Sequence, residues 1–313
     1  MILFPRVPRM KWLILLGACA GLVWGKEPAR PKIVGVPHLA VYAKDIDRSR
    51  AFYRDFLGFE EPFGGNGKLG GLTYFKINDR QYLKLVPETR SDSDRLSHIS
   101  LETENVEAMR NYLVSRGIAV PDKPKKDATG NLVLNVKDPE GHTVEFVQYL
   151  PDSLMAGTKG KQVSDGRVSK RLMHVGIIVT ALDPAMKFYT DVLGFREFWR
   201  GSSTGTQLSW INLKIPDGED YIELMLYKEA PAATARGSAH HQCLEVPDVQ
   251  AALTSLEAKP YRQGYTRPLE VRVGKNRRRQ LNLFDPDGTR TELMEPVTVD
   301  GKPAPSSDAP PPH

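Results

Sequence analysis

The sequence predicts an α+β protein built from two similar domains in tandem. The stretch VPHLAVYAKDIDRSRAFYRDFLGF at residues 36–59 is matched later by RLMHVGIIVTALDPAMKFYTDVLGF at residues 171–195. Counted from the histidine, the Phe-Tyr pair and the Leu-Gly-Phe end fall at the same positions in both copies. After this stretch, each half continues with the same order of elements. The length of 313 residues also suits two domains of ordinary size.

The repeated stretch combines the signals of a strand and of a helix. In the second copy, residues 175–179 are a short run rich in β-branched side chains, which indicates a buried strand. Asp183 and Pro184 predict a helix start, because aspartate accepts bonds from free N–H groups and proline holds φ near the helical value. Gly194 is expected to end the helix. Apolar residues recur at helical spacing between them: Leu182, Ala185, Met186, Tyr189, Val192 and Leu193.

The first domain, residues 32–150, is expected to contain two modules of one strand, one helix and three further strands (βαβββ). The pattern predicts strands at 33–41, 72–77, 82–86, 97–103, 132–136 and 143–149, and helices at 45–56 and 106–116. The second domain, residues 170–297, repeats the plan. Between them, residues 151–169 are rich in Gly, Ser and Lys and are expected to form an exposed linker. The proline-rich tail at 298–313 is expected to be disordered.

The first 25 residues resemble a signal peptide. Basic residues precede an apolar run at 12–24 that is short for a membrane span. Cleavage before Lys26 would leave residues 26–31 as a leader to the first domain, and Cys19 offers an alternative lipid attachment site. We therefore expect an exported protein, periplasmic or secreted, that touches a membrane only through a lipid anchor at Cys19. Its one remaining cysteine, Cys243, could form no internal disulfide.

Charge argues against nucleic acid as a partner. The net charge is +5, but the chain has no sustained basic face with interleaved aromatic residues. A small-molecule substrate is the expected partner, and the sequence leaves the oligomeric state open.

Together, the paired βαβββ modules, the H…FY…LGF opening and the DPxG…E closing resemble the vicinal oxygen chelate superfamily over residues 32–296. That superfamily includes glyoxalase I, extradiol dioxygenases and fosfomycin-resistance proteins. The resemblance implies that each mixed sheet curls into a cup with helices on its outer face. It also implies that metal ligands project into the cup from the first, fourth, fifth and eighth strands. The implied main ligand set is His174, Glu223, His241 and Glu292, and the implied weaker set is His38, His98 and Glu145, with Lys84 at the fourth position.

The residue pattern supports these ligand sets. In YIELMLY, Glu223 lies on the strand face opposite to Ile222 and Leu224, and Glu145 and His98 alternate with apolar residues in the same way. Two imidazoles with one or two carboxylates suit Zn, Ni, Co, Mn or Fe. His240 adjoins His241, but the spacing from His241 to the following Leu-Glu pair matches that of His98. We therefore expect His240 to face the other way.

One topological alternative remains at this stage, because the four ligand strands could come from one domain or from modules exchanged between domains. In the exchanged arrangement, the two sets would be His38, Lys84, His241, Glu292 and His174, Glu223, His98, Glu145. Either arrangement gives one complete site and one site that contains Lys84.

Three functions are compatible with the resemblance. The first is a divalent-metal enzyme with glyoxalase-I-like proton transfer (an isomerase, epimerase or lyase), in which Glu292 or Glu223 removes a proton next to a carbonyl. The second is an extradiol-type dioxygenase, which the set of His38, His98 and Glu145 favours. The third is a non-catalytic protein that binds small molecules. The four-ligand set favours the first.

Overall fold

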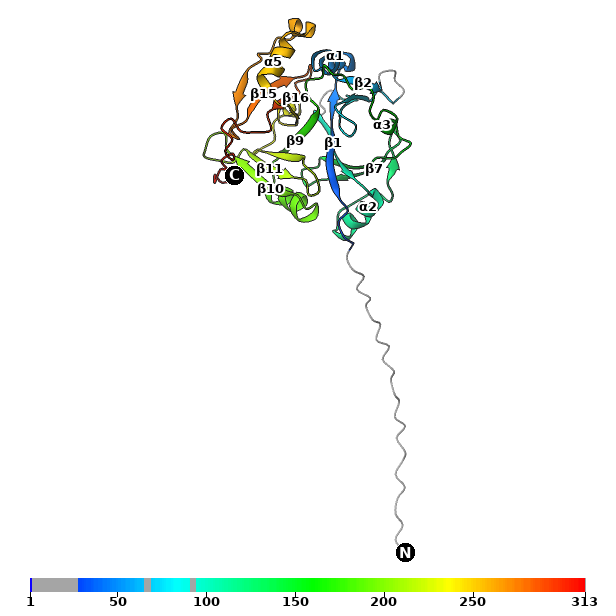
Figure 1. Ribbon diagram of the computed structural model, residues 1–313. Coiled ribbons are helices and arrows are strands. Elements are labelled where there is room, and N and C mark those ends of the chain that lie inside the picture. Colours follow the sequence, from blue (N-terminus) through cyan, green and yellow to red (C-terminus); the bar gives the residue numbers. More distant parts are fainter. Residues whose placement is uncertain (2–27, 65–68, 91–93, 313) are drawn as a thin grey trace.

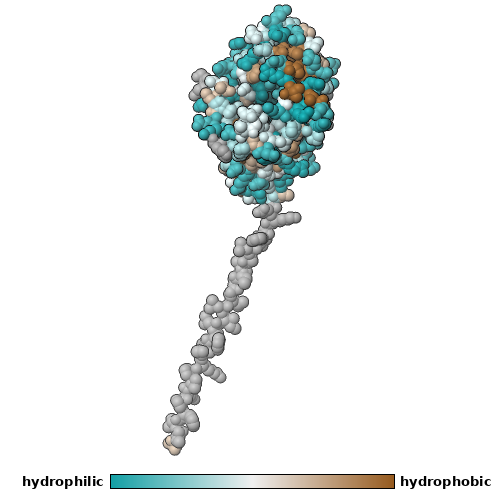
Figure 2. Space-filling model, turned by 90° about the vertical axis from the view of Figure 1, so that its left-hand side faces the viewer, coloured by the Kyte–Doolittle hydropathy of each residue, from teal (hydrophilic) through white to brown (hydrophobic). Residues whose placement is uncertain are grey.

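A computed structural model describes Met1 and residues 28–64, 69–90 and 94–312 of the chain. It contains two eight-stranded mixed sheets, one formed by each half of the sequence (Figure 1). The expected signal peptide, its cleavage site and Cys19 lie outside the described residues. Within the described part, no helix combines the length and the apolar character needed to cross a membrane. The face shown in Figure 2 is mainly hydrophilic and carries one compact hydrophobic patch.

The first sheet has the strand order β2-β3-β4-β1-β5-β8-β7-β6. Strand β1 pairs parallel with β4 and antiparallel with β5, and β5 pairs parallel with β8. Its strands are β1 (Ile33–Ala43), β2 (Glu60–Phe63), β3 (Thr73–Lys76), β4 (Tyr82–Pro87), β5 (Leu96–Thr103), β6 (Lys125–Lys126), β7 (Leu132–Lys137) and β8 (Thr143–Gln148). Its helical segments are α1 (Ile46–Ala51), the π-helix η1 (Phe52–Phe56) and α2 (Val106–Ser115).

The second sheet repeats this order as β10-β11-β12-β9-β13-β16-β15-β14, which confirms the predicted tandem α+β fold. Its strands are β9 (Arg171–Val179), β10 (Arg196–Gly201), β11 (Trp210–Lys214), β12 (Tyr221–Leu226), β13 (His241–Glu245), β14 (Val271–Val273), β15 (Arg279–Phe284) and β16 (Arg290–Met294). Its helical segments are α4 (Leu182–Met186), the π-helix η2 (Lys187–Val192), η3 (Ala233–Ser238), α5 (Val249–Glu257) and η4 (Pro260–Gly264). Each sheet is formed within one half of the chain, so the structure has no exchange of modules between domains.

The start of the helix in the second copy differs from the prediction. Helix α4 begins at Leu182, its N-cap is Ala181, and no side chain of its own domain caps it. Instead, Glu140 of the first domain accepts bonds from the backbone N–H groups of Thr180 and Ala181. Glu140 therefore holds the two residues immediately before the helix from across the domain boundary, which a local reading of Asp183 could not reveal.

Both repeated helices continue as π-helices where the sequence predicts unbroken α-helix. In the first copy, Phe52, Tyr53 and Phe56 are all buried within the π-helical segment. The wider π-helical turn changes the direction in which these large side chains leave the helix axis. Gly58 and Gly194 follow with φ of 81° and 78°, as expected for residues that end a helix in the left-handed region.

The segment at 151–169 is more closely packed than an exposed linker. It contains α3 (Leu154–Gly157), and Met155 packs against Tyr74 and Tyr82. The buried ammonium of Lys76 donates a bond to the carbonyl of Lys161 at 2.9 Å. The segment therefore covers part of the first sheet.

The tail, for which the sequence predicts disorder, contacts the second sheet. The indole of Trp199 donates a bond to the carbonyl of Pro305 at 2.9 Å, and the backbone N–H of Ser307 donates to the carbonyl of Arg200 at 3.0 Å. Strand β10 lies at the edge of its sheet and has backbone groups free to pair. An extended proline-rich chain can use them without burying a core of its own.

Candidate metal centre

The second sheet brings together all four residues of the main ligand set on one face, which we call the second cup. The Nε2 atoms of His174 on β9 and His241 on β13 are 3.1 Å apart. An oxygen of Glu292 on β16 lies 3.6 Å from the first of these nitrogens and 3.7 Å from the second. The nearest oxygen of Glu223 on β12 lies 3.4 Å from the His241 nitrogen and 4.0 Å from that of His174.

These distances fit a divalent cation. Two nitrogens about 2.1 Å from one ion and at right angles to each other would be about 3.0 Å apart. The ligand atoms of His174, His241 and Glu292 all lie within 4.8 Å of one another. His174 and His241 are fully buried, so bulk solvent does not reach the two imidazoles. The donor set and its spacing are therefore suitable for Mn, Fe, Co, Ni or Zn.

A glycine makes room for one of these imidazoles. Gly176 on β9 lies directly opposite His241 on β13 in the sheet. A Cβ atom at position 176 would be 2.0 Å from Cε1 of His241. The glycine therefore allows the His241 ring to lie flat over β9 and point into the second cup.

Neighbouring groups hold the ligands in place. Nδ1 of His241 is 2.8 Å from the carbonyl oxygen of Ala239, which fixes the ring with Nε2 pointing inward. The Cys243 thiol is hydrogen-bonded to Glu292. Residues Asn212 and Asn282 lie opposite Glu223 and Glu292 in the sheet, and the side-chain oxygen of each is buried without a partner among the described residues.

Burial shifts the pKa values of the four residues of the main ligand set. It lowers the pKa of both His174 and His241 well below the usual range, and the nearby charge of Arg290 lowers both further. Burial raises the pKa of Glu223 to about 8, and the negative charge of Glu292 adds to the effect. Burial also raises the pKa of Glu292. Without an ion, the histidines are therefore neutral and Glu223 retains a proton near neutral pH.

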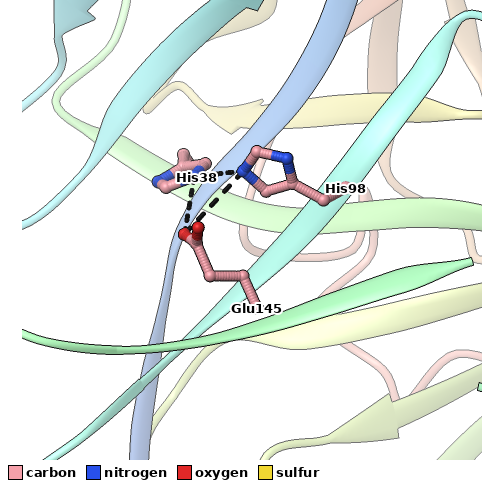
Figure 3. Close-up of side chains that lie close together, drawn as sticks. All are labelled: His38, His98 and Glu145. Atoms are coloured by element: carbon pink, nitrogen blue, oxygen red, sulfur yellow. Dashed lines mark hydrogen bonds and ion pairs between the residues drawn. The ribbon is translucent and has the colours of Figure 1, made fainter. Parts of the chain in front are cut away.

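The first sheet brings together the second set, His38, His98 and Glu145, on the face we call the first cup (Figure 3). The Nε2 atoms of His38 and His98 are 3.0 Å apart. One oxygen of Glu145 lies 3.3 Å from Nε2 of His38 and 3.8 Å from Nε2 of His98. Ser100 donates a bond to the same oxygen at 3.0 Å. This geometry closely matches that of the second cup.

The fourth position differs in charge. Nζ of Lys84, on β4, lies 3.2 Å from Nε2 of His98, and Lys84 is only 5% exposed. Burial alone would raise the pKa of Glu145, but His98, His38 and Lys84 together hold it below the usual range. An ion in the first cup would face an ammonium group where the second cup presents Glu223.

The second cup borders a cavity of about 60 Å³, lined by Trp199, Trp210, Glu223, Glu292 and Arg290 among others. Beside the first cup, Nζ of Lys84 lies 5.3 Å from the centre of the Tyr74 ring, which packs with Tyr82 and Met155. Arg290, Asn212 and Asn282 were not among the predicted site residues. The two-residue period of a strand could have placed Arg290 on the face of Glu292.

His240 lies apart from the ligand group. Its Nε2 is 3.5 Å from an Asp94 oxygen, and its ring packs edge-on against His142 of the first domain. The side chains of His240 and His241 thus point in different directions, as the alternation of a strand requires.

Comparison with known proteins places this geometry in context. The family model described as Glyoxalase/Bleomycin resistance protein/Dioxygenase superfamily matches residues 35–146 and 171–293. A 4-hydroxyphenylpyruvate dioxygenase from Yarrowia lipolytica is 26% identical over 198 residues, which cover 53% of this chain and 50% of the relative. The human mitochondrial methylmalonyl-CoA epimerase is 30% identical over 136 residues, which cover 40% of this chain and 73% of the relative.

Solved structures agree on the fold. The Mn(II)-bound glyoxalase from Novosphingobium aromaticivorans superposes with a TM-score of 0.66 at 19% identity. The match covers 90% of this chain and 89% of the glyoxalase. The dioxygenase relative, by contrast, is matched over only half of its length.

Proposed function

Because the chain belongs to the Glyoxalase/Bleomycin resistance protein/Dioxygenase superfamily, we propose that it is a divalent-metal-dependent enzyme with its active centre in the second cup. We assign it a proton-transfer reaction, as in an isomerase, epimerase or lyase, on a small molecule with two adjacent oxygens. The observation that carries this proposal is the second carboxylate, Glu223, beside the group of two histidines and Glu292. The Mn(II)-bound state of the glyoxalase supports a divalent ion of this kind.

In this proposal the four residues of the second cup have different roles. His174, His241 and Glu292 would hold the ion, and a bound ion would supply Lewis-acid polarisation of a carbonyl group in the bound molecule. Glu223 takes a proton from the carbon next to that carbonyl and returns it at a neighbouring atom or to the other face of the same carbon. As the carboxylate, Glu223 lies 3.4 Å from Nε2 of His241 and 4.0 Å from that of His174, close enough to reach a molecule held at this group.

Exchange of the substrate's α-proton for solvent deuterium tests the assignment of Glu223 as the base. The Mn²⁺-loaded chain is incubated in D₂O with small hydroxyketones and 2-hydroxy acids, and deuterium at the α-carbon is followed by NMR. We expect exchange that, per bound ion, Glu223→Gln slows by about 10²-fold or more. Equal exchange in Glu223→Gln and wild type would show that Glu223 is not the base.

A ring-cleaving dioxygenase activity is the second candidate. The first cup supports it, because His38, His98 and Glu145 form a two-histidine, one-carboxylate group. The dioxygenase relative gives further support. Lys84 weighs against it, since its ammonium lies beside the ligand nitrogen of His98. Oxygen consumption by the Fe²⁺-loaded chain with a panel of catechols would favour this candidate over proton transfer.

We also propose that the chain is exported, on the basis of the basic start and apolar run within residues 1–25. The mature chain should begin near Lys26 or at a lipidated Cys19. Intact-mass measurement of protein from a membrane-and-periplasm fraction tests this. A full-length chain in the cytosol would contradict it.

A further inference from the structure

We propose that the second cup binds the carboxylate group of its ligand through Arg290, with support from Lys275, so that the substrate is a small anionic molecule. This inference rests on the proposed metal site, and it adds a substrate class that the ligand set does not specify.

Arg290 lies on the inner face of the second cup. It comes two residues before Glu292 on β16, so both side chains leave the same side of the strand. Both line the cavity between Trp199 and Trp210. Nε of Arg290 is buried and has no hydrogen-bond partner among the described residues.

Once an ion is bound, His241 cannot accept a hydrogen bond from the guanidinium of Arg290. Nη2 of Arg290 is 2.8 Å from Nδ1 of His241. Nδ1 of His241 is also 2.8 Å from the carbonyl oxygen of Ala239. A neutral imidazole that binds an ion through Nε2 carries its proton on Nδ1, and Ala239 offers the acceptor for it. Nδ1 therefore cannot accept a bond from Arg290. The guanidinium then has unused donors at the wall of the cup.

Charge gives an independent argument. In the described part of the chain, the only charged groups lining this cavity are Glu223, Glu292, Arg290 and Lys275. The two carboxylates balance a divalent ion, and Arg290 with Lys275 then leaves two positive charges in excess. A bound carboxylate would offset this charge, and a guanidinium can bind both of its oxygens.

The size of the cavity limits what enters it. About 60 Å³ reaches the ligand group, whereas pockets for drug-sized ligands measure about 300–1,000 Å³. The space beside Arg290 suits a group as small as a carboxylate.

Oxalate, a small dicarboxylate, is the probe. Its binding to the Mn²⁺-loaded full chain is measured by isothermal titration calorimetry for wild type, Arg290→Gln and Arg272→Gln. Arg272 is the control, because it belongs to the same domain and pairs with Glu270 at the exposed surface. We expect Arg290→Gln to weaken oxalate binding at least tenfold at unchanged metal content. Arg272→Gln should change it less than twofold.

The outcomes separate the two proposals. Unchanged oxalate binding in metal-loaded Arg290→Gln would overturn this inference alone. Loss of the metal from Arg290→Gln would also overturn it, because Arg290 would then support the ligand set and not the substrate. A wild-type chain that holds no divalent ion would contradict the proposed function, and this inference with it.

Discussion

The hydroxyl of Tyr53 in the first domain donates a hydrogen bond to Asp285 of the second domain at 3.1 Å. The reverse pair exists as well: Tyr189 of the second domain donates to Asp138 of the first at 2.9 Å. The tyrosines come from the repeated Phe-Tyr pair and the aspartates from the repeated DPxG turn. The two motifs that mark the duplication thus join the domains to each other.

Removing either hydroxyl should destabilise the protein. In Tyr53→Phe and Tyr189→Phe, a buried carboxyl loses one of its hydrogen-bond donors, which costs about 1–3 kcal/mol in the free energy of unfolding. Tyr261→Phe is the control, since the Tyr261 ring packs on Phe56 nearby and the structure shows no bond from its hydroxyl. Chemical denaturation measures the three changes. Equal stability of Tyr53→Phe and Tyr261→Phe would mean that the interdomain bond contributes nothing.

Asp285 should make stability fall as pH rises. Burial raises its pKa to about 7, so the folded chain holds a proton there that the unfolded chain, with an ordinary carboxyl, releases near pH 4. Between pH 4 and 7 the native state therefore binds more protons, and this contribution to stability declines with pH, by up to about 1.4 kcal/mol per unit.

The variant Asp285→Asn removes that titration and keeps an oxygen for the N–H groups of Asp287 and Thr289. The stability of Asp285→Asn relative to wild type should therefore increase from pH 4 to pH 8. Denaturation curves across this range test it, and a difference that is constant with pH would be the contrary result.

Metal affinity should rise with pH up to about 8. The ion needs ionised carboxylates, and burial raises the pKa of Glu223 and Glu292 in its absence. Binding at pH 6–7 must therefore displace the proton of Glu223, at a cost in affinity of up to about tenfold per pH unit. Competition with a chelator of known affinity at pH 6, 7 and 8 measures the slope. A flat profile would indicate that these carboxyls are already ionised or do not bind the ion.

Gly176→Ala should disturb the second cup. The added Cβ would collide with the His241 ring, so the ring must turn away and leave the ligand group. We expect reduced metal content and a loss of about 1–3 kcal/mol in stability. Gly157→Ala is the control, because a Cβ at position 157 meets nothing within 4 Å. Full metal content in Gly176→Ala would show that the His241 ring can shift without penalty.

Lys84→Glu should create a second strong site. At roughly 4 Å and an effective dielectric near 20, an ammonium repels a divalent ion by several kcal/mol. Replacing it gives the first cup the carboxylate that Glu223 provides in the second. Bound metal should approach two equivalents per chain, whereas Lys125→Glu, at an exposed position on β6, should leave it unchanged. No gain in Lys84→Glu would point to the closed packing around Tyr74 and Met155 as the barrier.

The local sequence patterns predicted the fold because each strand and helix is marked by the spacing of its own apolar residues and by the residues at its ends. The family resemblance implied His174, His241 and Glu292 as metal ligands, and the structure brings their ligand atoms within 4.8 Å of one another. Contacts that depend on two distant segments left no such signal. Glu140 binds backbone N–H groups just before a helix of the other domain, and the tail contacts an edge strand, although neither sequence indicates a partner. Arg290 is neither an acidic nor an imidazole ligand, so the pattern of metal ligands did not indicate it.

Elemental analysis of the purified chain tests the central claim most directly. We predict about one divalent ion per chain in wild type, well under one in Glu292→Ala, and no loss in Glu145→Ala, the equivalent position of the first cup. Two equivalents in wild type, or an ion lost from Glu145→Ala but retained in Glu292→Ala, would contradict the assignment of the metal centre to the second domain.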